Sequence, residues 1–580
     1  MVKVAIGLNR PHLFIDSSIR LHDLRGRNYI LNHAQRLFQF LIKSYALEHD
    51  LGAKILRVGG GRSEVEISQV DTELFEELFS LSNNLNQILF PSYVDIDVGS
   101  STLIKGIPSV SASAGKVCDI CKARDDYDVS GNEFLSQIKR DDPLCEIDLM
   151  LRGVGRVLNS SATMSIWTFR EKNCKPCIDN QSTMFEIDDL KVYLTRRAEN
   201  HGDIAVINYK SITNYLIGYT VTKAKELVNL VPKDVNRDNV SEVIKIVKAK
   251  IRDLIGSNTA DQLFDASEVL YGVDFDFNPY VTYIDPLWVT INLRGRRSEV
   301  GLDSIVESGN YAYIIRGDGD HFGAFVDLNK FKEASKEIGL QINNSSEEWT
   351  MAIEEELYKF KTFLPLFLGS QYDAITVYLG GDENYIILSS SDPVDLLEIV
   401  SRIRQEILDI GVGVIKKLTN YDNVERIRKF LLERKIMTFS SSAIITKGDF
   451  PIYHINEVLN RYMEYVKEEA IPSERDSLAV LFLTNPSIRY EDKILVLKMS
   501  YEGNDILSVI PQVVGRYGYS NLNTVLQNLY VWSSEIGQEK TEELLSLVIN
   551  NILKTKISEE YEGHLLGFLD LIDSLHKGSR

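Results

Sequence analysis

Apolar, β-branched runs occupy residues 374–379 and 385–388, and the pair Gly380 and Gly381 lies between them, followed by two acids. Runs of this kind joined by two glycines are typical of a β-hairpin with a tight turn. The hydrophobic pattern therefore predicts a hairpin in this part of the chain. The acids that follow the glycines are either a solvated hairpin tip or part of a site.

The predicted elements occur twice in the order βαββαβ, which is the ferredoxin-like split pattern. The first copy comprises a strand at 2–8, a helix at 27–49, a strand, glycine turn and strand over 54–67, a helix at 71–89 and a strand at 93–98. The second comprises a strand at 311–316, helical stretches between 328 and 363, the hairpin at 374–388, a helix at 393–410, a strand at 437–445, a helix at 455–470 and a strand at 478–483. The repetition predicts an internal duplication.

The second copy carries acids at two places that such a fold brings together. Asp318 follows the strand at 311–316, and Asp382 and Glu383 follow the hairpin glycines. Carboxylates are the ligands that Mg²⁺ prefers, usually one or two with water and phosphate oxygens. Two such ions can stabilise the attacking and leaving oxygens of an in-line displacement. Glycines at the turn let the backbone approach a triphosphate closely.

The first copy lacks these acids. Aligning the two hairpins places Gly61 and Arg62 opposite the turn acids, and the first strand ends in Gly7-Leu8-Asn9 without an acid to match Asp318. This asymmetry is unexpected if the turn acids only serve solubility. We predict that the second copy binds metal and that the first does not.

Two CxxC pairs lie between the copies, at Cys118 and Cys121 and at Cys174 and Cys177. Two such pairs fit a closed, tetrahedral Cys₄ zinc site of structural type. The long stretch between the pairs requires an insertion that loops out, and Cys145 within it is expected to be a spare thiol. Reduced free thiols are the alternative. Five cysteines in 580 residues are too few for a disulfide scaffold.

These patterns predict an α+β multidomain protein with two ferredoxin-like (βαββαβ) domains. Helical runs at 222–230 and 240–255, with apparent strands at 280–283 and 287–292, suggest a linker domain, and the pattern from residue 486 is mostly helical. The predicted domains are a first ferredoxin-like domain (1–115), a zinc-binding insertion (116–205), a helical linker domain (206–305), a second ferredoxin-like domain (306–485) and a C-terminal helical bundle (486–580).

Composition narrows the class of protein. Hydrophobic residues make up 44% and charged residues 25% of the chain, as in ordinary soluble proteins. The net charge of −19 argues against coating nucleic acid directly, because phosphate contacts need clustered Lys and Arg, but it allows contact through partner subunits. No apolar run is long enough to span a membrane and no signal peptide is recognised, so we expect a cytoplasmic protein without membrane association.

Together these motifs resemble the large, cyclase-like subunit of type III CRISPR effector complexes, in the form without an N-terminal HD nuclease domain. In order, they are Leu24-Arg25-Gly26-Arg27-Asn28, the Gly59-Gly60-Gly61 turn, Gly317-Asp318-Gly319-Asp320 as a D-x-D strand end, Gly380-Gly381-Asp382-Glu383 as a GGDD-type motif, and Thr438-x-Ser440 with Pro451 and Lys467. The family's last motif position is Asp, whereas this chain has Glu383, as in GGDEF cyclases. The dipeptide His22-Asp23 lies in the start of the first domain, and we assign it no catalysis.

The resemblance implies an inactive first palm and an active second palm that converts ATP into cyclic oligoadenylate when the complex binds target RNA. Asp318 and Asp382 would ligate Mg²⁺ or Mn²⁺, and Glu383 would assist the metal or orient the attacking 3′-hydroxyl. The implied partners are the other effector subunits, crRNA and, through the complex, target RNA. The nucleotide-binding residues implied are Gly319, Gly380, Gly381, Ser440 and Lys467.

Several roles stay open at this point. Lys467 could neutralise triphosphate charge or be a solvated helix lysine, and Ser440 could contact the base or be a core-strand serine. Asp320 could support the site or lie on the surface, and His321 is expected to neighbour the site without binding metal. Two other functions remain: a scaffold subunit with a weakened GGDE site, and a free-standing GGDEF-like dinucleotide cyclase.

Overall fold

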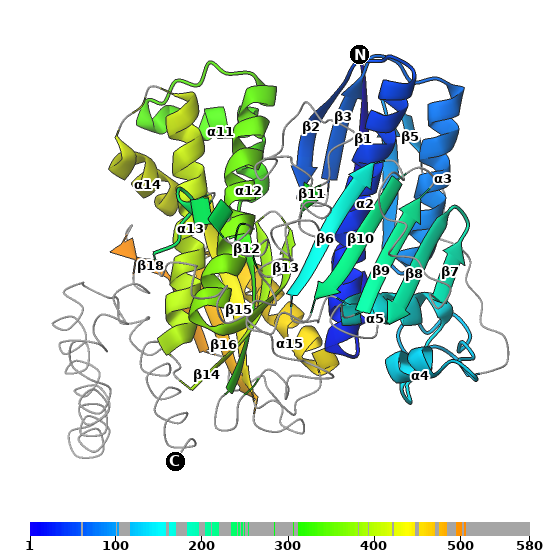
Figure 1. Cartoon of the computed structure of the whole chain (residues 1–580). Helices are drawn as coiled ribbons and strands as arrows, with labels where there is room; N and C mark the ends of the chain where they lie inside the picture. Colours follow the sequence, from blue (N-terminus) through cyan, green and yellow to red (C-terminus); the bar gives the residue numbers. More distant parts are fainter. Residues whose placement is uncertain are drawn as a thin grey trace, which may run out of the picture. The chain divides into compact units, whose positions relative to one another are not determined.

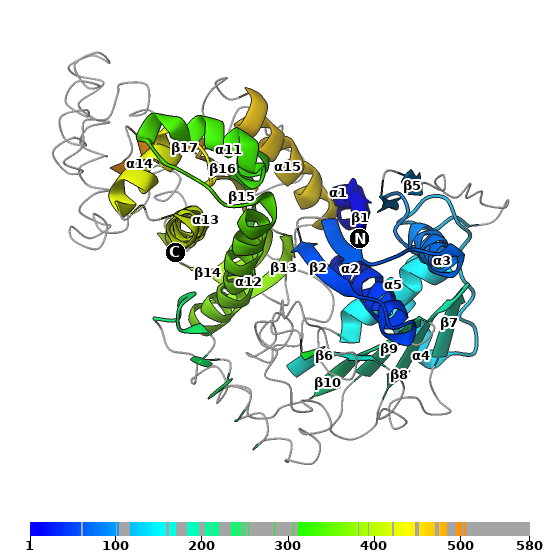
Figure 2. The ribbon, with the colours of Figure 1, turned by 90° about the horizontal axis from the view of Figure 1, so that it is seen from above.

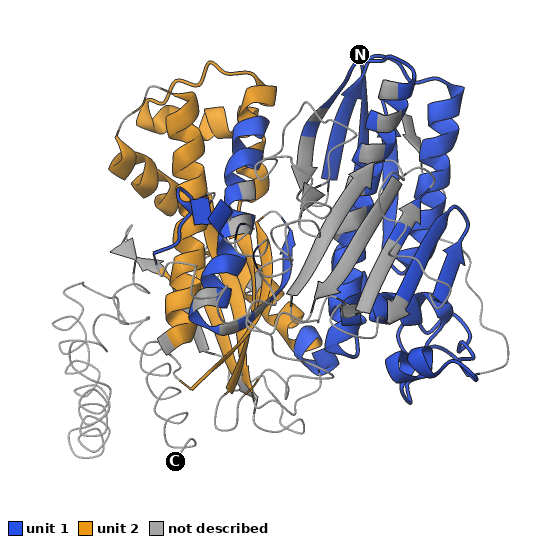
Figure 3. Ribbon diagram, in the orientation of Figure 1, with its two compact units in different colours: residues 1–305, 350–381, 451–456 blue, residues 306–349, 382–450, 457–580 orange. Residues whose placement is uncertain are grey.

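The structure of the chain is a computed structural model. It describes residues 1–59, 62–99, 101–103, 116–157, 162–169, 183–196, 203–209, 212–219, 234–240, 242–243, 245–246, 249, 253, 283–284, 306, 311–380, 382–391, 394–419, 421, 423–446, 452–469, 475–483, 495–501 and 504–505. Two compact units divide the chain (Figure 3). Unit 1 comprises residues 1–305, 350–381 and 451–456, and unit 2 comprises residues 306–349, 382–450 and 457–580.

An antiparallel sheet is formed by the first strands of unit 1 (Figure 1). It contains β1 (Val2–Asn9), β2 (Ala53–Gly59), β3 (Arg62–Ile67), β4 (Tyr93–Val98) and β5 (Ser101–Leu103), in the spatial order β2-β3-β1-β4-β5. The central strand β1 pairs antiparallel with both β3 and β4. Buried and half-buried residues alternate along β3, so Val65 and Ile67 enter the core while their neighbours face outward.

Three helices connect the strands of this sheet. Helices α1 (Pro11–Asp16) and α2 (Leu21–Glu48) lie between β1 and β2, and α3 (Thr72–Ile88) lies between β3 and β4. Helix α2 packs against β2 and β3, and α3 packs against β4. The side chain of Asp71 caps α3 by accepting a hydrogen bond of 3.0 Å from the backbone N–H of Leu74. The buried face of α3 has helical spacing and includes Leu74, Leu78, Leu81 and Leu85.

Helix α2 begins at Leu21, earlier than the predicted start at Arg27. The carboxylate of Asp23 accepts a hydrogen bond of 2.9 Å from the backbone N–H of Arg20, which stabilises the earlier start. Gly26, inside this longer helix, permits close helix packing. An added Cβ at Gly26 would lie 1.8 Å from the backbone oxygen of Leu151.

A second sheet of unit 1 follows α4 (Glu133–Lys139) and α5 (Glu146–Val157) (Figures 1 and 2). Its strands are β6 (Ala162–Phe169), β7 (Thr183–Ile187), β8 (Leu190–Arg196), β9 (Asp203–Tyr209), β10 (Ile212–Tyr219) and β11 (Tyr283–Ile284), in the order β11-β6-β10-β9-β8-β7. Helix α5 packs against α2 and against strands of this sheet.

This sheet changes one predicted boundary. The division predicted between residues 205 and 206 falls inside β9, because hydrogen bonding continues from β8 through β9 to β10. The helical linker predicted for 206–305 therefore begins as two strands of the preceding sheet. The helix predicted at 222–230 and most of that at 240–255 lie outside the described residues, as does the strand predicted at 287–292.

The sheet that contains the candidate acids has the order β13-β14-β12-β15-β16-β17. Its strands are β12 (Tyr311–Asp320), β13 (Asp373–Gly380), β14 (Glu383–Ser390), β15 (Thr438–Thr446), β16 (Ser477–Leu483) and β17 (Leu495–Lys498). The central strand β12 pairs antiparallel with β14 and β15, and β15 pairs parallel with β16. Residues 311–315 of β12 are all buried, as expected for a strand covered on both faces.

Helices between these strands complete the second half. They are α10 (Phe322–Val326), α11 (Leu328–Ser335), a 3₁₀ turn (Lys336–Ile338), α12 (Ser346–Gln371), α13 (Val394–Leu418), α14 (Val424–Glu433), α15 (Ile452–Glu464) and a π-helical segment (Tyr465–Glu469). Helix α13 packs on β15. The indole of the fully buried Trp349 donates a hydrogen bond of 2.8 Å to the backbone oxygen of Phe325 and packs against the Phe325 and Phe331 rings.

The two halves share one strand order. The order β2-β3-β1-β4 of the first sheet corresponds to β13-β14-β12-β15 of the later one, which is the arrangement of the βαββαβ pattern. The later sheet also extends beyond the predicted boundary at residue 485. Strand β17 pairs with β16 in this sheet, whereas β18 (Ser500–Tyr501) and β19 (Asn504–Asp505) pair in a separate two-stranded sheet. Residues 506–580, which make up most of the predicted C-terminal helical bundle, lie outside the described residues.

Candidate functional site

Asp318 lies near the end of the central strand β12. The register places Asp318 opposite Ser440 of β15, and the neighbouring Gly317 opposite Asn384 of β14. Its side chain is partly exposed, with 26% of its surface accessible. The acid therefore stands between two strands at one end of the sheet, where a small ligand can reach it.

Asp382 contacts the backbone that carries Asp318. An added Cβ at Gly319 would lie 2.8 Å from the Cβ of Asp382 and 2.9 Å from its Oδ2 atom. Real side chains do not approach this closely, so glycine is required at position 319 and the Asp382 side chain lies directly over β12. Asp382 is therefore in contact with the residue that directly follows Asp318, although the two acids are distant in sequence. Glu383 is half-buried as the first residue of β14.

These acids do not form a compact ligand group. Among the described residues, the group of three or more candidate ligands whose atoms all lie within 4.8 Å of one another is a different one, and Asp318, Asp382 and Glu383 are not in it. The donor set itself suits a hard divalent cation, because carboxylates and the carbonyl of Gly319 supply oxygen ligands.

Lys467 contributes the positive charge at this strand end. Its ammonium group forms an ion pair and a hydrogen bond with Oδ2 of Asp318, and 18% of the lysine side chain is exposed. The lysine lies in the π-helical segment Tyr465–Glu469. From its sequence Lys467 could be either a site residue or a solvated lysine, and its contact with Asp318 makes it part of this cluster.

Of the two hairpin glycines, the structure describes Gly380. At Gly380 an added Cβ would lie 1.8 Å from the hydroxyl oxygen of Tyr378, so the absence of a side chain there makes room for a buried tyrosine. Packing alone is thus sufficient to explain glycine at this position. Gly381 lies outside the described residues.

Ser440 is fully buried, which favours the core-strand alternative over contact with a base. Its hydroxyl donates a hydrogen bond of 2.7 Å to Asp320, and the hydroxyl of Thr438 donates another of 3.0 Å. The backbone N–H of Asp476 donates a third, of 2.8 Å. Burial, together with the charge of Asp476, raises the pKa of Asp320 to about 7. Asp320 therefore belongs to an internal network and not to the surface.

Two members of this network were missed by the sequence analysis. Arg404 on α13 holds the carboxylate of Asp476 with hydrogen bonds of 2.5 and 2.8 Å, and both side chains are fully buried. Nothing in the local sequence pairs these residues, because they approach only when α13 packs on the sheet. His321 is exposed, and its Nδ1 lies 2.9 Å from the backbone oxygen of Lys435, consistent with a neighbour of the site.

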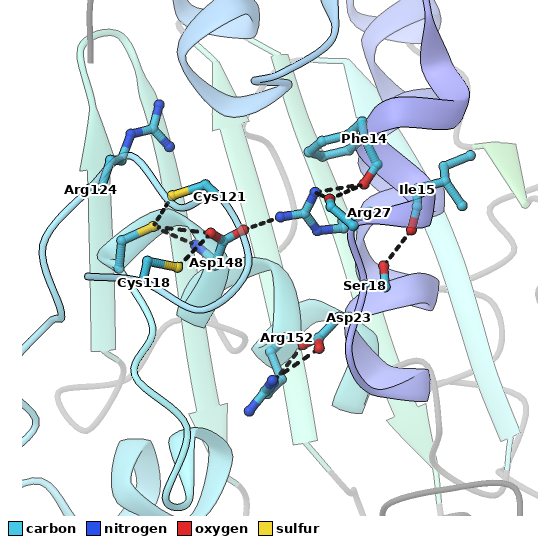
Figure 4. A network of polar contacts seen from close by, with 12 residues as sticks. Phe14, Ile15, Ser18, Asp23, Arg27, Cys118, Cys121, Arg124, Asp148 and Arg152 are labelled. Carbon is cyan, nitrogen blue, oxygen red and sulfur yellow. Dashed lines mark hydrogen bonds and ion pairs between the residues drawn. The ribbon is translucent and has the colours of Figure 1, made fainter. Parts of the chain in front are cut away.

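A cluster of thiols lies in unit 1 (Figure 4). The ligand atoms of Cys118, Cys121, Cys145 and Asp148 all lie within 4.8 Å of one another. Oδ2 of Asp148 lies 3.0 Å from Sγ of Cys118 and 3.2 Å from Sγ of Cys145, and Sγ of Cys121 lies 3.8 Å from Sγ of Cys145. Cys145 is therefore not the spare thiol that the sequence analysis expected.

The chain brings this cluster together through two local structures. A turn in which the backbone N–H of Lys122 donates to the oxygen of Cys118 holds the CxxC pair. Cys145 directly precedes α5, and Asp148 occupies the first turn of that helix. Sequence spacing gives no sign of Cys145 and Asp148 as ligands, because helix α5 brings them to the CxxC turn. Cys174 and Cys177 lie outside the described residues.

The electrostatics of the cluster favour one thiolate, on Cys121, whereas hydrogen bonds from Cys118 and Cys121 and burial raise the pKa of Cys145. Hydrogen bonds from Cys118 and Cys145 lower the pKa of Cys121 to about 3, so the cluster holds one thiolate readily. Burial raises the pKa of Asp148, although Arg27 on α2 forms an ion pair with its Oδ1 atom. Arg27 also donates hydrogen bonds of 2.6 Å to the Phe14 oxygen and 2.8 Å to the Ser17 hydroxyl. Three thiols and one carboxylate fit the ligand types of tetrahedral zinc.

None of the described helices is long and apolar enough to cross a membrane.

Comparisons with known proteins give likenesses among solved structures. No family model matches this sequence, and no curated protein matches it. The chain is similar to the crystal structure of the apo Csm1-Csm4 cassette, with a TM-score of 0.45 and 13% identity over 100% of this chain and 70% of that chain. The Csm1-Csm4 subcomplex of the type III-A CRISPR-Csm interference complex gives a TM-score of 0.45 and 13% identity, covering 98% of this chain and 69% of that one.

A third structure is the Csm1-Csm4 cassette in complex with cA4, with a TM-score of 0.41 and 12% identity, covering 98% of this chain and 69% of that chain. Identities and scores this low leave the family and the function of this chain to be argued from its own residues.

Proposed function

We propose that this chain is the large subunit of a cytoplasmic type III CRISPR effector complex and converts ATP into cyclic oligoadenylate when the complex binds target RNA. The observation that carries the proposal is the placement of Asp382 against Gly319, beside Asp318, at the end of a central strand. The ordered motifs along the sequence support the same function. The domains proposed are two ferredoxin-like palms, a zinc-binding insertion and a C-terminal helical domain.

In this reaction the 3′-hydroxyl of one ATP attacks the α-phosphorus of another, forming a phosphodiester bond as the bond to pyrophosphate breaks. Asp318 and Asp382 would hold Mg²⁺ or Mn²⁺, which when bound neutralises phosphate charge. Glu383, beside them on β14, would orient the hydroxyl or assist in holding the cation. Because phosphoryl transfer depends mainly on positioning and charge, few side chains suffice.

The thiol cluster has a separate, structural role in this proposal. Cys118, Cys121, Cys145 and Asp148 would hold Zn²⁺, replacing the ligand set predicted from the two CxxC pairs. The closed site would leave no coordination position for substrate. Its ligands connect the turn of the insertion to α5, and Arg27 connects Asp148 to α2.

The test is reconstitution with the partner subunits, crRNA and target RNA, followed by incubation with ATP and Mn²⁺. We expect cyclic oligoadenylate only when the target RNA is present. A complex that assembles and binds target RNA but makes no product would favour a scaffold. The loose arrangement of Asp318, Asp382 and Glu383 is the observation that keeps this second function in view. A parallel reaction with GTP tests for a dinucleotide cyclase.

A further inference from the structure

Lys467 is the counter-ion of Asp318 at the candidate cation site. The lysine ammonium bonds to Oδ2 of Asp318, and both side chains are mostly shielded from water. The lysine is carried by residues 465–469, a π-helical segment that directly follows α15. π-Helical turns are rare and are frequently found at functional sites. The charge of the acid is thus balanced by the chain itself.

We propose that Lys467 exchanges one ionic partner, Asp318, for another, the triphosphate of the nucleotide. It holds Asp318 while the nucleotide site is empty, and it releases that carboxylate to the divalent cation when nucleotide enters, its ammonium moving to the triphosphate. This inference rests on the proposed function and deepens it, because it assigns to one side chain the coupling between metal binding and nucleotide binding.

The Lys467 ammonium and a divalent cation compete for the carboxylate of Asp318, because the ammonium is bonded to its Oδ2 atom. Lysine is suited to exchange because its charge sits on a flexible four-carbon stem. A triphosphate carries several negative charges against one on Asp318, so a nearby triphosphate is the stronger partner.

Competition of this kind predicts positive coupling between nucleotide and metal. Metal alone must displace the Lys467 ammonium from Asp318. When nucleotide is bound, the ammonium has already moved from Asp318 to the triphosphate, so the metal does not have to displace it. By linkage, each ligand then tightens the other by the same factor. Metal without nucleotide should therefore bind weakly to the natural chain and more tightly once the lysine charge is removed.

The experiment measures Mn²⁺ binding to the purified full-length chain by electron paramagnetic resonance of free Mn²⁺, with and without a non-hydrolysable ATP analogue. We expect Lys467→Gln to bind Mn²⁺ about threefold to fivefold more tightly than the natural chain when no nucleotide is present, a size typical of removing a partly exposed ion pair. The analogue should tighten Mn²⁺ binding by the natural chain and have a smaller effect on Lys467→Gln.

The matched control is Lys429→Gln, which removes the same charge from an exposed position on α14, where Lys429 pairs with Glu433. It should leave Mn²⁺ binding unchanged. Lys467→Arg, which keeps a positive charge, should bind Mn²⁺ like the natural chain.

Two results would overturn the inference. Equal or weaker Mn²⁺ binding by Lys467→Gln rejects the exchange, even if the complex makes oligoadenylate, and the proposed function then stands without it. An Asp318→Asn variant that leaves the Mn²⁺ binding curve unchanged shows that no cation binds there, and in that case the proposed metal site fails together with the inference.

Discussion

The sheets around β1 and β12 have the same strand order but opposite chemistry at their ends. When the hairpins are aligned at the first residue after each turn, Arg62 corresponds to Glu383 and Gly7 to Asp318. The register agrees, since Gly7 pairs with both Arg62 of β3 and Asp95 of β4. An added Cβ at Gly7 would lie 2.7 Å from Oδ1 of Asp95. In the first sheet, Asp95 of the neighbouring strand β4 therefore occupies the space next to Gly7. In the later sheet, the corresponding position on the central strand is itself an acid, Asp318.

The sources of positive charge also differ. In the first sheet Arg62 belongs to the hairpin strand and pairs with Glu64 at 2.8 Å and Asp97 at 3.1 Å, so the acids there are neutralised within the sheet. In the later sheet Lys467 approaches Asp318 from a helical segment outside the sheet. A charge fixed in a strand stabilises structure, whereas a charge on a separate segment can be exchanged for a ligand. The same strand order thus carries an end whose charges are paired within the sheet and an end whose acid is paired from outside the sheet.

The largest expected effect separates the two ends by their acids. Asp382→Asn keeps the shape of the side chain but removes a cation ligand, so we expect oligoadenylate synthesis by the assembled complex to fall by about a hundredfold or more. Asp95→Asn at the first sheet should leave synthesis within about twofold of the natural rate. Product is measured by chromatography after RNA-triggered reaction. Equal losses in the two variants would remove the distinction between the sheets.

The glycines offer the next test. In Gly319→Ala the new methyl group would collide with Asp382, so we expect synthesis to fall by roughly tenfold to a hundredfold and Mn²⁺ binding to weaken. In Gly7→Ala the methyl group would meet only the end of the Asp95 side chain, which accepts a hydrogen bond of 2.8 Å from Asn9. That variant should lose about 1 kcal/mol of stability and keep its activity. Denaturation midpoints and product assays on both variants decide the matter.

The sequence predicted the framework better than the connections between its parts. The strand at 93–98 was predicted with the bounds that the structure has, because its apolar alternation is local. The placement of Asp382 beside the strand of Asp318 follows from the order of the elements and two glycines. The thiol cluster depends on α5, and the network of Asp320 depends on α13 packing over the sheet. Long-range packing of this kind leaves no spacing signal in the sequence.

Removing the thiol cluster tests whether the first half is structural. Cys145→Ser and Cys118→Ser should each reduce bound zinc, measured by elemental analysis, from about one ion per chain to a small fraction. Because Asp148 lies on α5 and pairs with Arg27 of α2, we expect the thermal unfolding transition of this part of the chain to move to lower temperature.

Any complex that still assembles with the thiol variants should keep its rate per assembled complex. Cys174→Ser is the matched control, because the proposed site does not use Cys174. Loss of zinc in Cys174→Ser but not in Cys145→Ser would restore the ligand set predicted from the two CxxC pairs.

The smallest expected effect concerns the ion pairs that tie the insertion to α2. Asp142 accepts a hydrogen bond of 2.8 Å from Arg20 and another of 2.5 Å from Arg152. Burial opposes its charge, but these two arginines outweigh burial and lower the pKa of Asp142 below its usual value of 3.8. A carboxyl whose pKa is lower in the folded state stabilises the fold above its unfolded pKa and loses that contribution as pH falls through its folded pKa. The stability difference between the natural chain and Asp142→Asn should therefore be constant from about pH 5 to 8 and shrink below about pH 4. Urea unfolding at a series of pH values measures it, and a difference that grows on acidification would contradict the assignment of these arginines as its stabilising partners.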